Sequence, residues 1–292
     1  MRIENHVIYN MSAANAPIAR VESGTTLTFV TRDCFNNQLQ GDNPVIDTLD
    51  WDAINPATGP VYVEGAEPGD ILKVKIEKLE LAECGTMAAI PENGVLGDIV
   101  KNSVVKKVPV KDGIMEFSAD IKLPCNPMIG VIGVAPAEGA IPCGEPGCHG
   151  GNMDNTKIAE GATLYFPVFH KGALLAMGDV HAGMGDGEIM VTGVEIPAEI
   201  TVTVEILKGK SIQNPRMENE EACYTIASDE NIEKAIYTAV SDMTAVVMEK
   251  MDMTLEEAGM LLSAMGNLQF CQVVDPKRTV RMEMKKSVLK GF

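Results

Sequence analysis

The stretch ITVTVEIL, residues 200–207, decides the fold class, because apolar and polar side chains alternate along it almost without exception. Ile200, Val202 and Val204 would fall on one face of an extended strand, and the polar residues between them would fall on the other face. A strand of this kind buries one face and exposes the other, as strands of antiparallel sheets commonly do. The stretch therefore predicts a protein built mainly of β-sheet.

Further strand patterns fill most of the first two thirds of the chain. The turn EPGD at residues 67–70 precedes an apolar-rich run that begins at Ile71. Comparable short runs occur at residues 25–30, 129–134, 164–169 and 173–177. Many short strands separated by turns are typical of sandwiches and barrels. We therefore expect a mainly β, sandwich-like or barrel-like arrangement.

Helical patterns begin only in the last third of the chain. Apolar residues recur at helical spacing over residues 232–247, and Ser228 or Asp229 is the expected N-cap. Thr254 and Glu257 form a capping box, which opens a second helix that should run to about residue 264. These patterns predict that two helices pack near the C-terminus.

Two expected strands, at residues 270–274 and 279–285, complete a smaller C-terminal α+β portion. We accordingly divide the chain into two parts. Residues 1–165 should form a β-rich, sandwich-like portion that contributes Asp33 and the segment HGGNMDN. Residues 166–292 should hold a strand hairpin that carries GDVHAGMGDGE, followed by the α+β portion.

Charge and composition exclude several functional classes. The chain has 292 residues and a formal net charge of −17, so it lacks the basic footprint that nucleic-acid binding requires and is a poor match to a membrane surface. No apolar run approaches the roughly 18 residues of a transmembrane helix. The first ten residues show no signal-peptide pattern, and the seven cysteines are irregularly spaced. We therefore expect a cytoplasmic protein without disulfides.

The stretch GDVHAGMGDGEI, residues 178–189, concentrates polar groups among glycines. Asp179 and His181 are two residues apart, so both side chains of a strand would face the same side, and a carboxylate with an imidazole is half of a divalent-metal site. The glycine-rich loop could bring Asp186 or Glu188 back toward them, with a second strand at 189–195. The alternative remains open, because Asp-Gly pairs are ordinary hairpin chemistry and a single strand histidine is more often a hydrogen-bonded core residue.

Two other stretches carry candidate site residues. GEPGCHGGNMDN, residues 144–155, offers His149 and Asp154 in a glycine-rich setting, and a zinc knuckle there is disfavoured because no second short-spaced ligand pair exists. In TRDCFNNQL, residues 31–39, Asp33 closes a strand and could project into a cleft, although a strand-ending turn aspartate is the commoner outcome. The single tryptophan, Trp51, is expected in the core.

Familiar catalytic motifs are absent from the sequence. It contains neither the GxGxxG pattern between a strand and a helix nor GxxxxGK[ST], which argues against dinucleotide and P-loop sites. It also lacks the GxSxG elbow that carries the nucleophile of many serine hydrolases. Hydrolysis would more naturally use water activated by a metal ion.

Several segments together resemble the acetamidase/formamidase family. They are NPATGPVYVEGAEPGD, GVIGVAPAEG, HGGNMDN, GATLYFPVFHKGAL, GDVHAGMGDGEI and CQVVDPKRTVRME, which follow one another over nearly the whole chain. The resemblance implies a β-rich fold, metal-assisted hydrolysis of short amides to a carboxylate and ammonia, and a homo-oligomer, either a dimer or a dimer of dimers. It places the family's polar motif positions at Asp33, His149, Asn152, Asp154, Asp179, His181, Glu188 and Glu195.

These positions give a working hypothesis. Asp33, Asp179 and His181 would hold a divalent ion, with His149 as a possible fourth ligand. Zinc is the first expectation for this mixed set of nitrogen and oxygen donors, and a carboxylate-rich site could also hold calcium or manganese.

The remaining polar positions receive roles toward the substrate. Glu188 would accept a proton from water and pass it to the leaving amine, while Glu195 would orient a ligand. Asn152 and Asp154 would bind the small amide substrate. The competing interpretation is a non-catalytic, metal-containing protein that binds small molecules, or a member of the same family with a different small amide as its substrate.

An oligomer is also expected from the first predicted helix. Ala235, Val246 and Met248 lie off its main apolar stripe. A helix that is apolar on several faces needs cover from elsewhere.

Overall fold

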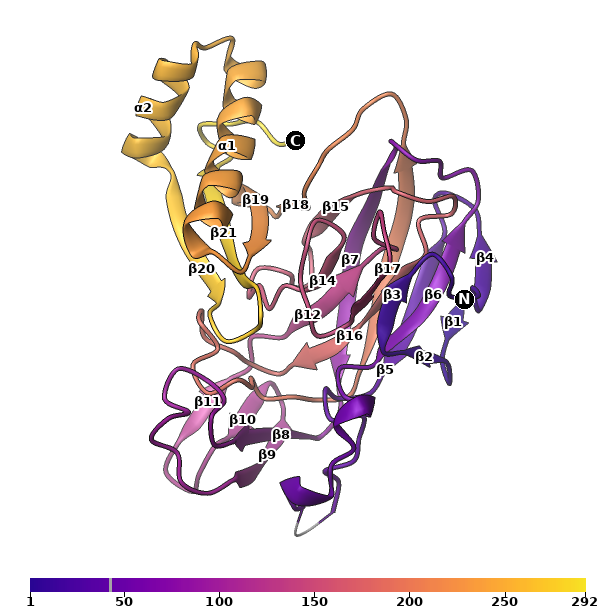
Figure 1. Cartoon of the computed structure of the whole chain (residues 1–292), viewed down its shortest axis with the longest axis vertical. Coiled ribbons are helices and arrows are strands. Elements are labelled where there is room, and N and C mark those ends of the chain that lie inside the picture. Colours follow the sequence, from indigo (N-terminus) through magenta and orange to yellow (C-terminus); the bar gives the residue numbers. More distant parts are fainter. Residues whose placement is uncertain (42–43) are drawn as a thin grey trace.

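A computed structural model, which describes residues 1–41 and 44–292, is built around two large packed β-sheets (Figure 1). The nine-stranded sheet runs in the order β1 (Arg2–Ile3), β5 (Thr26–Thr31), β17 (Ala198–Leu207), β7 (Ile71–Leu81), β15 (Thr163–Pro167), β18 (Arg216–Glu218), β19 (Ala222–Asp229), β21 (Arg278–Lys285), β20 (Asn267–Gln272). The six-stranded sheet contains β14 (Gly150–Asn152), β12 (Met128–Gly133), β16 (Leu175–His181), β6 (Ala57–Val63) and β2 (Val7–Ile8) in that order, with β4 (Ala19–Val21) paired to β6.

Two smaller sheets complete the β structure. Four strands pair in the order β11 (Lys122–Pro124), β10 (Ile114–Glu116), β9 (Val104–Lys111), β8 (Cys84–Ala89), and they form the separate lobe at the bottom of Figure 1. The other pair is β13 (Ala140–Pro142) with β3 (Asn10–Ser12).

The alternating stretch at residues 200–207 lies in β17, at the centre of the sandwich. Ile200, Val202 and Val204 are fully buried, and Ile200 lies opposite Phe29 of β5 and Leu79 of β7. Apolar side chains from the two large sheets form one core cluster, which includes Phe29, Val61, Leu72, Ile132, Phe166, Met177 and Val202. Each such side chain contributes roughly 1.5–3 kcal/mol when it is buried. The predicted mainly β, sandwich-like fold is confirmed.

Strands on both sides of residue 165 pair in the same two sheets. β15 pairs with β7, while β16 lies between β12 and β6. The C-terminal strands extend the nine-stranded sheet through β18, so the α+β portion continues the sandwich in hydrogen-bonded register.

Two helices, α1 (Ile232–Met251) and α2 (Leu255–Met265), pack in the C-terminal portion, where α1 lies against β19 and β21. The predicted capping box of α2 is confirmed, with both Thr254 and Glu257 bonds present. The N-cap of α1 is Asn231, so the expectation of Ser228 or Asp229 is wrong. The Asn231 side chain accepts hydrogen bonds from two backbone N–H groups of the first turn, which stabilises this start. Neither helix in the described part of the chain is long and apolar enough to span a membrane.

The structure corrects two further expectations. Residues 189–195 do not form a regular strand, because Glu188 and Val191 adopt left-handed backbone angles (φ 49° and 71°), and only an isolated bridge links His181 to Glu195. Trp51 is 49% exposed and does not enter the core. It starts the short 3₁₀ helix Trp51–Ala53, whose turn presents the ring at the surface.

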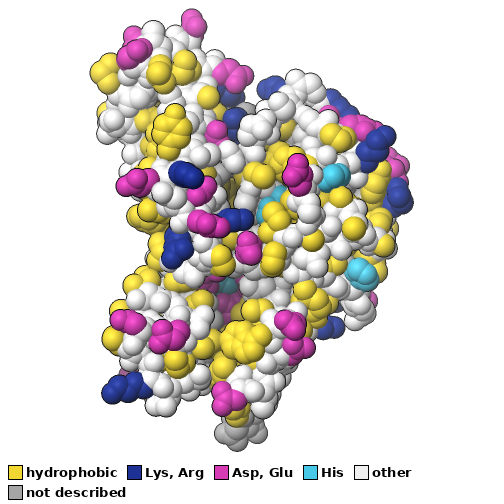
Figure 2. Space-filling view, in the orientation of Figure 1, with side chains coloured by type: hydrophobic (Ala, Val, Ile, Leu, Met, Phe, Trp, Pro, Cys, Tyr) yellow, Lys and Arg dark blue, Asp and Glu magenta, His cyan; other side chains and the backbone are white. Residues whose placement is uncertain are grey.

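The argument for an oligomer from α1 also fails. Ala235 and Val246 are buried within the same chain, in the cluster beneath the two helices. Most of the exposed large apolar side chains of this portion lie on α2 and β20, and they are Leu255, Met260, Met265, Leu268 and Phe270, while Tyr237 and Met251 are exposed on α1. Figure 2 shows hydrophobic side chains gathered on this upper lobe.

Candidate active site

The end of β16 places the central pair of the site. Asp179 and His181 lie together as their spacing predicted, with His181 Nε2 3.5 Å from Asp179 Oδ1, although Asp179 has a left-handed φ of 54°. Gly130 of the adjacent strand β12 leaves space for the acids. A Cβ there would lie 2.5 Å from Asp154 Oδ1 and 2.6 Å from Asp179 Oδ2, so a larger residue would displace both carboxylates.

Carboxylates surround the His181 imidazole. Its Nε2 atom lies 3.1 Å from Glu195 Oε2 and 3.8 Å from Asp154 Oδ1, in addition to Asp179, and all four side chains are almost completely buried. The other oxygen of Glu195, Oε1, accepts a hydrogen bond of 2.8 Å from the Gly193 backbone N–H. This bond fixes the carboxylate with Oε2 toward His181.

Burial and neighbouring charges shift the pKa values of Glu195, Asp154 and His181. Burial, with the nearby Asp179 charge, raises the pKa of Glu195 to about 8 and that of Asp154 well above its ordinary value. Burial alone would lower the pKa of His181, but the carboxylates of Glu195 and Asp179 outweigh it and raise the pKa well above its ordinary value. The cluster therefore favours positive charge at its centre.

Glu188 approaches the same cluster from the loop after β16. One ligand atom each from Glu188, Asp154 and His181 lie within 4.8 Å of one another, and these three residues form the first donor set. Cys34, Asp179 and Glu195 form a second donor set by the same criterion. Burial, followed by the charge of Asp154, raises the pKa of Glu188 well above its ordinary value. Two donor sets thus converge on one buried region.

Several buried polar atoms of the cluster have no hydrogen-bond partner among the described residues. They are both carboxylate oxygens of Asp154, Oδ1 of Asp179, both ring nitrogens of His181 and Oε2 of Glu195. Buried polar atoms are normally hydrogen-bonded, so these atoms are available to bind a further group. Carboxylate oxygens and an imidazole nitrogen are donors suited to a divalent cation.

Two residues expected as ligands lie outside both donor sets. Asp33 is buried, and its oxygens accept hydrogen bonds from the Asn37 N–H (2.6 Å) and the Gln40 side chain (2.9 Å). Burial raises the pKa of Asp33, although the Asn37 N–H and the Lys107 charge oppose the rise. Burial also lowers the pKa of His149 to about 4, and neither of its nitrogens has a partner in the described structure.

The residues expected to bind substrate separate into two positions. Asn152 of β14 donates a hydrogen bond of 3.0 Å to Asp275 Oδ2, and its own Oδ1 remains without a partner among the described residues. Asp154 instead belongs to a donor set with His181 and Glu188. Glu188 and Glu195, expected in catalysis, both belong to the donor sets as well.

Sequence reasoning assigned no role to Asp275 and Cys34. Asp275 lies on the loop between β20 and β21, and burial together with the Asp179 charge raises its pKa to about 8. Cys34 follows Asp33 and belongs to the donor set with Asp179 and Glu195, and burial raises the pKa of its thiol well above the ordinary value. The segment CQVVDPKRTVRME was part of the resemblance and could have drawn attention to Asp275.

The cluster opens into a cleft of about 640 Å³, a size typical of small-molecule sites. Its polar lining includes Asp179, Glu188, Glu195, Asn152 and Asp275. The apolar lining of the cleft, here called the apolar wall, includes Phe35, Trp51, Ile54, Ile90 and Val191. Figure 2 shows acidic and histidine side chains at the bottom of a recess near the middle of the face shown.

Comparison with known proteins gives consistent relationships. The model of the Acetamidase/Formamidase family matches residues 8–142 and 137–231. A crystal structure of a protein from Thermoanaerobacter tengcongensis, described as a predicted acetamidase/formamidase, has a TM-score of 0.95 and 49% identity, with 98% of this chain and 95% of that chain covered. An acetamidase structure from Bacillus halodurans has a TM-score of 0.96 and 40% identity, with 98% of both chains covered.

A more distant curated relative is the formamidase of Methylophilus methylotrophus. It is 26% identical over 253 residues, which cover 65% of this chain and 61% of the relative. The chain spans less than two thirds of the length of the curated relatives it matches.

Proposed function

The chain belongs to the acetamidase/formamidase family, and from that membership we propose that it hydrolyses short linear amides to a carboxylate and ammonia in the cleft at His181. One observation carries the proposal: buried, unpartnered carboxylate and imidazole atoms converge at the floor of a small-molecule cleft. A binding protein for a neutral molecule would have no need of this concentration of buried charge.

A divalent cation fits the donor atoms at this floor. We assign Asp179, His181, Glu195 and Asp154 as the residues that would hold it, with zinc as the first choice and calcium or manganese as alternatives. Such an ion supplies Lewis acidity, which polarises an amide carbonyl and makes water more acidic. Asp33 and His149 are left out of this ligand set, because both lie outside the two donor sets.

Glu188 is assigned to proton transfer. Its carboxylate would accept a proton from the attacking water as the new C–O bond forms, and would then deliver that proton to the amide nitrogen as the C–N bond breaks. Its position beside Asp154 and His181 supports this role, because a divalent ion held there would favour the ionised carboxylate that a general base requires. The leaving nitrogen departs as ammonia.

Asn152 and the apolar wall would position the substrate. The unpartnered Oδ1 of Asn152 can accept a hydrogen bond from the amide NH₂ group, while the Nδ2–Asp275 bond fixes the direction of Oδ1. The acyl group of the substrate would then lie toward Trp51 and Phe35. The bond from the Gly193 N–H to Glu195 Oε1 would hold Glu195 Oε2 in place for the ion.

The test is a steady-state assay of ammonia release from formamide, acetamide and propionamide. It is made on the purified protein with elemental analysis, then after chelation, and again after zinc is restored. We expect release with at least one amide, loss on chelation and recovery with zinc. The absence of ammonia from all three amides with metal-loaded protein would leave a metal-containing binding protein and would overturn the proposal.

We also propose that the protein forms a cytoplasmic homo-oligomer, a dimer or a dimer of dimers. The seven free cysteines support a reducing compartment. The exposed apolar residues of α2 and β20 support an interface between copies. A monomer in light scattering at micromolar concentration would contradict the oligomer.

A further inference from the structure

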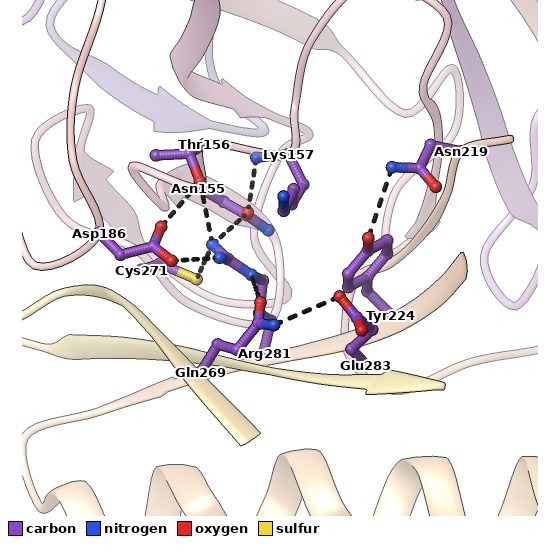
Figure 3. Close-up of polar contacts among 10 residues, drawn as sticks. All are labelled: Asn155, Thr156, Lys157, Asp186, Asn219, Tyr224, Gln269, Cys271, Arg281 and Glu283. Carbon is purple, nitrogen blue, oxygen red and sulfur yellow. Dashed lines mark hydrogen bonds and ion pairs between the residues drawn. The ribbon is translucent and has the colours of Figure 1, made fainter. Parts of the chain in front are cut away.

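Arg281, in the middle of β21, is 1% exposed, although arginine is rarely buried without partners. Its guanidinium contacts three different segments, which Figure 3 shows together. Nη2 lies 2.5 Å from Asp186 Oδ2, Nη1 donates to Asn155 Oδ1 at 3.0 Å, and Nε donates to Gln269 Oε1 at 2.6 Å. One side chain of the C-terminal portion therefore reaches two loops of the sandwich.

Both loops carry residues of the candidate site. Asn155 follows Asp154 directly, and Asp186 precedes Glu188 by two residues. A hydrogen bond of 2.7 Å from Thr156 Oγ1 to Asp186 Oδ1 also joins the loops to each other. The relative placement of Asp154 and Glu188 thus depends on contacts made just beside them.

The backbone at these two positions needs such support. Asp154 and Glu188 have φ values of 41° and 49°, in the left-handed region that L-residues seldom occupy. Conformations of this kind persist only where the surrounding structure fixes them. The end of β20 and the residue after it add two further hydrogen bonds to the second loop, because Gly187 N–H donates to Cys271 O at 2.8 Å and Val273 N–H donates to Gly187 O at 3.2 Å.

We propose that Arg281 is a positioning residue that holds Asp154 and Glu188 in register across the site, through Asn155 on one loop and Asp186 on the other. Arg281 itself does not belong to the donor sets, so its effect would be exerted through geometry. The kinetic part of the test rests on the proposed amidase function, whereas the structural part does not.

Asp186→Asn is the first test variant, because the Asp186 side chain is 43% exposed and the change preserves its shape. Arg281→Lys is the second, since lysine keeps the charge but cannot contact both loops with a planar fork. We expect each variant to lower kcat by roughly 10- to 100-fold with little change in KM, because misplacement of about 1 Å at a reacting group can cost 100-fold. The kcat of the double variant should be no lower than that of the less active single variant, because both substitutions break the same network.

Val246→Ala is the matched control. It removes buried methyl groups from the same C-terminal portion, but it touches neither loop. This variant should lower the melting temperature while kcat stays within about threefold of the parent, well short of the loss expected for misplaced reacting groups. If Arg281→Lys does not fold, Asp186→Asn alone decides the test.

Hydrogen–deuterium exchange provides the readout that does not depend on amide hydrolysis. Asp186→Asn should speed exchange in residues 152–157 and 184–190, and Val246→Ala should not. If the parent protein releases no ammonia but exchange rises in both loops, the amidase function fails and the positioning role stands. Unchanged exchange in these loops, or a kcat within threefold of the parent when the parent is active, would overturn the positioning role.

Discussion

Replacing Glu188 with glutamine separates proton transfer from cation binding. The side chain is only 6% exposed, so glutamine, which has nearly the same size, should leave the packing intact. Glutamine can still donate and accept hydrogen bonds but cannot carry the proton from water to the leaving nitrogen. The substitution therefore removes one chemical capability from the site.

The expected magnitude follows from that role. General acid–base catalysis is worth roughly 10²- to 10⁴-fold in rate, or about 2.7–5.4 kcal/mol of barrier at about 1.36 kcal/mol per tenfold. We expect Glu188→Gln to lose kcat in this range while KM for the amide changes little. The matched control is Glu145→Gln, which removes a carboxylate from the same cleft, near Lys277 at 3.5 Å, and should change kcat by less than about threefold, since it takes no part in proton transfer.

Stability gives a second readout with a defined sign. The pKa of Glu188 is raised in the folded protein, so the fold loses stability as the pH rises from the ordinary carboxyl value toward the raised one. Glutamine stays neutral throughout. Without metal, Glu188→Gln should therefore equal or exceed the parent in stability at pH 7, and its advantage should shrink toward pH 4.

The assay combines ammonia release with elemental analysis and thermal melts. Near-normal turnover of Glu188→Gln would refute the assignment of proton transfer to Glu188. Loss of the ion in this variant would make Glu188 a ligand, and the base would then be sought at Glu195 or Asp154. Asp186, a further carboxylate of this loop, is paired with Arg281 and is a poor candidate.

Three other predictions use different parts of the site. His181→Ala should abolish stoichiometric zinc binding in elemental analysis while the far-ultraviolet circular dichroism of the sandwich persists; full zinc occupancy would remove His181 from the ligands. Zinc at about 100 times its Kd should stabilise the parent by about 2.7 kcal/mol in melts, if it binds only the folded state, and an unchanged melting temperature would contradict a site at the cluster. Trp51→Ala should lower kcat/KM for butyramide about 5- to 10-fold relative to formamide, because the indole lines the apolar wall, and equal effects on both amides would contradict that contact.

Local patterns predicted the parts of the fold that local physics controls. The alternation in β17 and the Thr254–Glu257 capping box involve neighbours within a few residues, and both appear in the structure. The proximity of Asp179 and His181 has the same origin, since residues two apart on a strand share a face.

The rest of the site depends on contacts between distant segments. Asp275 reaches the cleft only because β20 and β21 extend the sandwich sheet and point their connecting loop toward the centre of the molecule (Figure 1). The left-handed angle of Val191 opposes the preference of a β-branched residue, so tertiary contacts must impose it and no local pattern reveals it. The prediction that Trp51 lies in the core was wrong for a related reason, because a large aromatic ring can line a cleft as well as fill a core.

The acidic cluster and its rigid surroundings have a common physical explanation. Burial and mutual repulsion raise the pKa values of Asp154, Glu188, Glu195 and Asp275, so these groups subtract from stability whenever they are ionised without a cation. The sandwich core on one side, and the Arg281 contacts on the other, hold the loops against that repulsion. A divalent ion would offset the same repulsion, so the charges that weaken the metal-free fold are also those that favour binding. Removing one carboxylate should therefore act with opposite signs, raising stability without metal and lowering the stabilisation that metal provides.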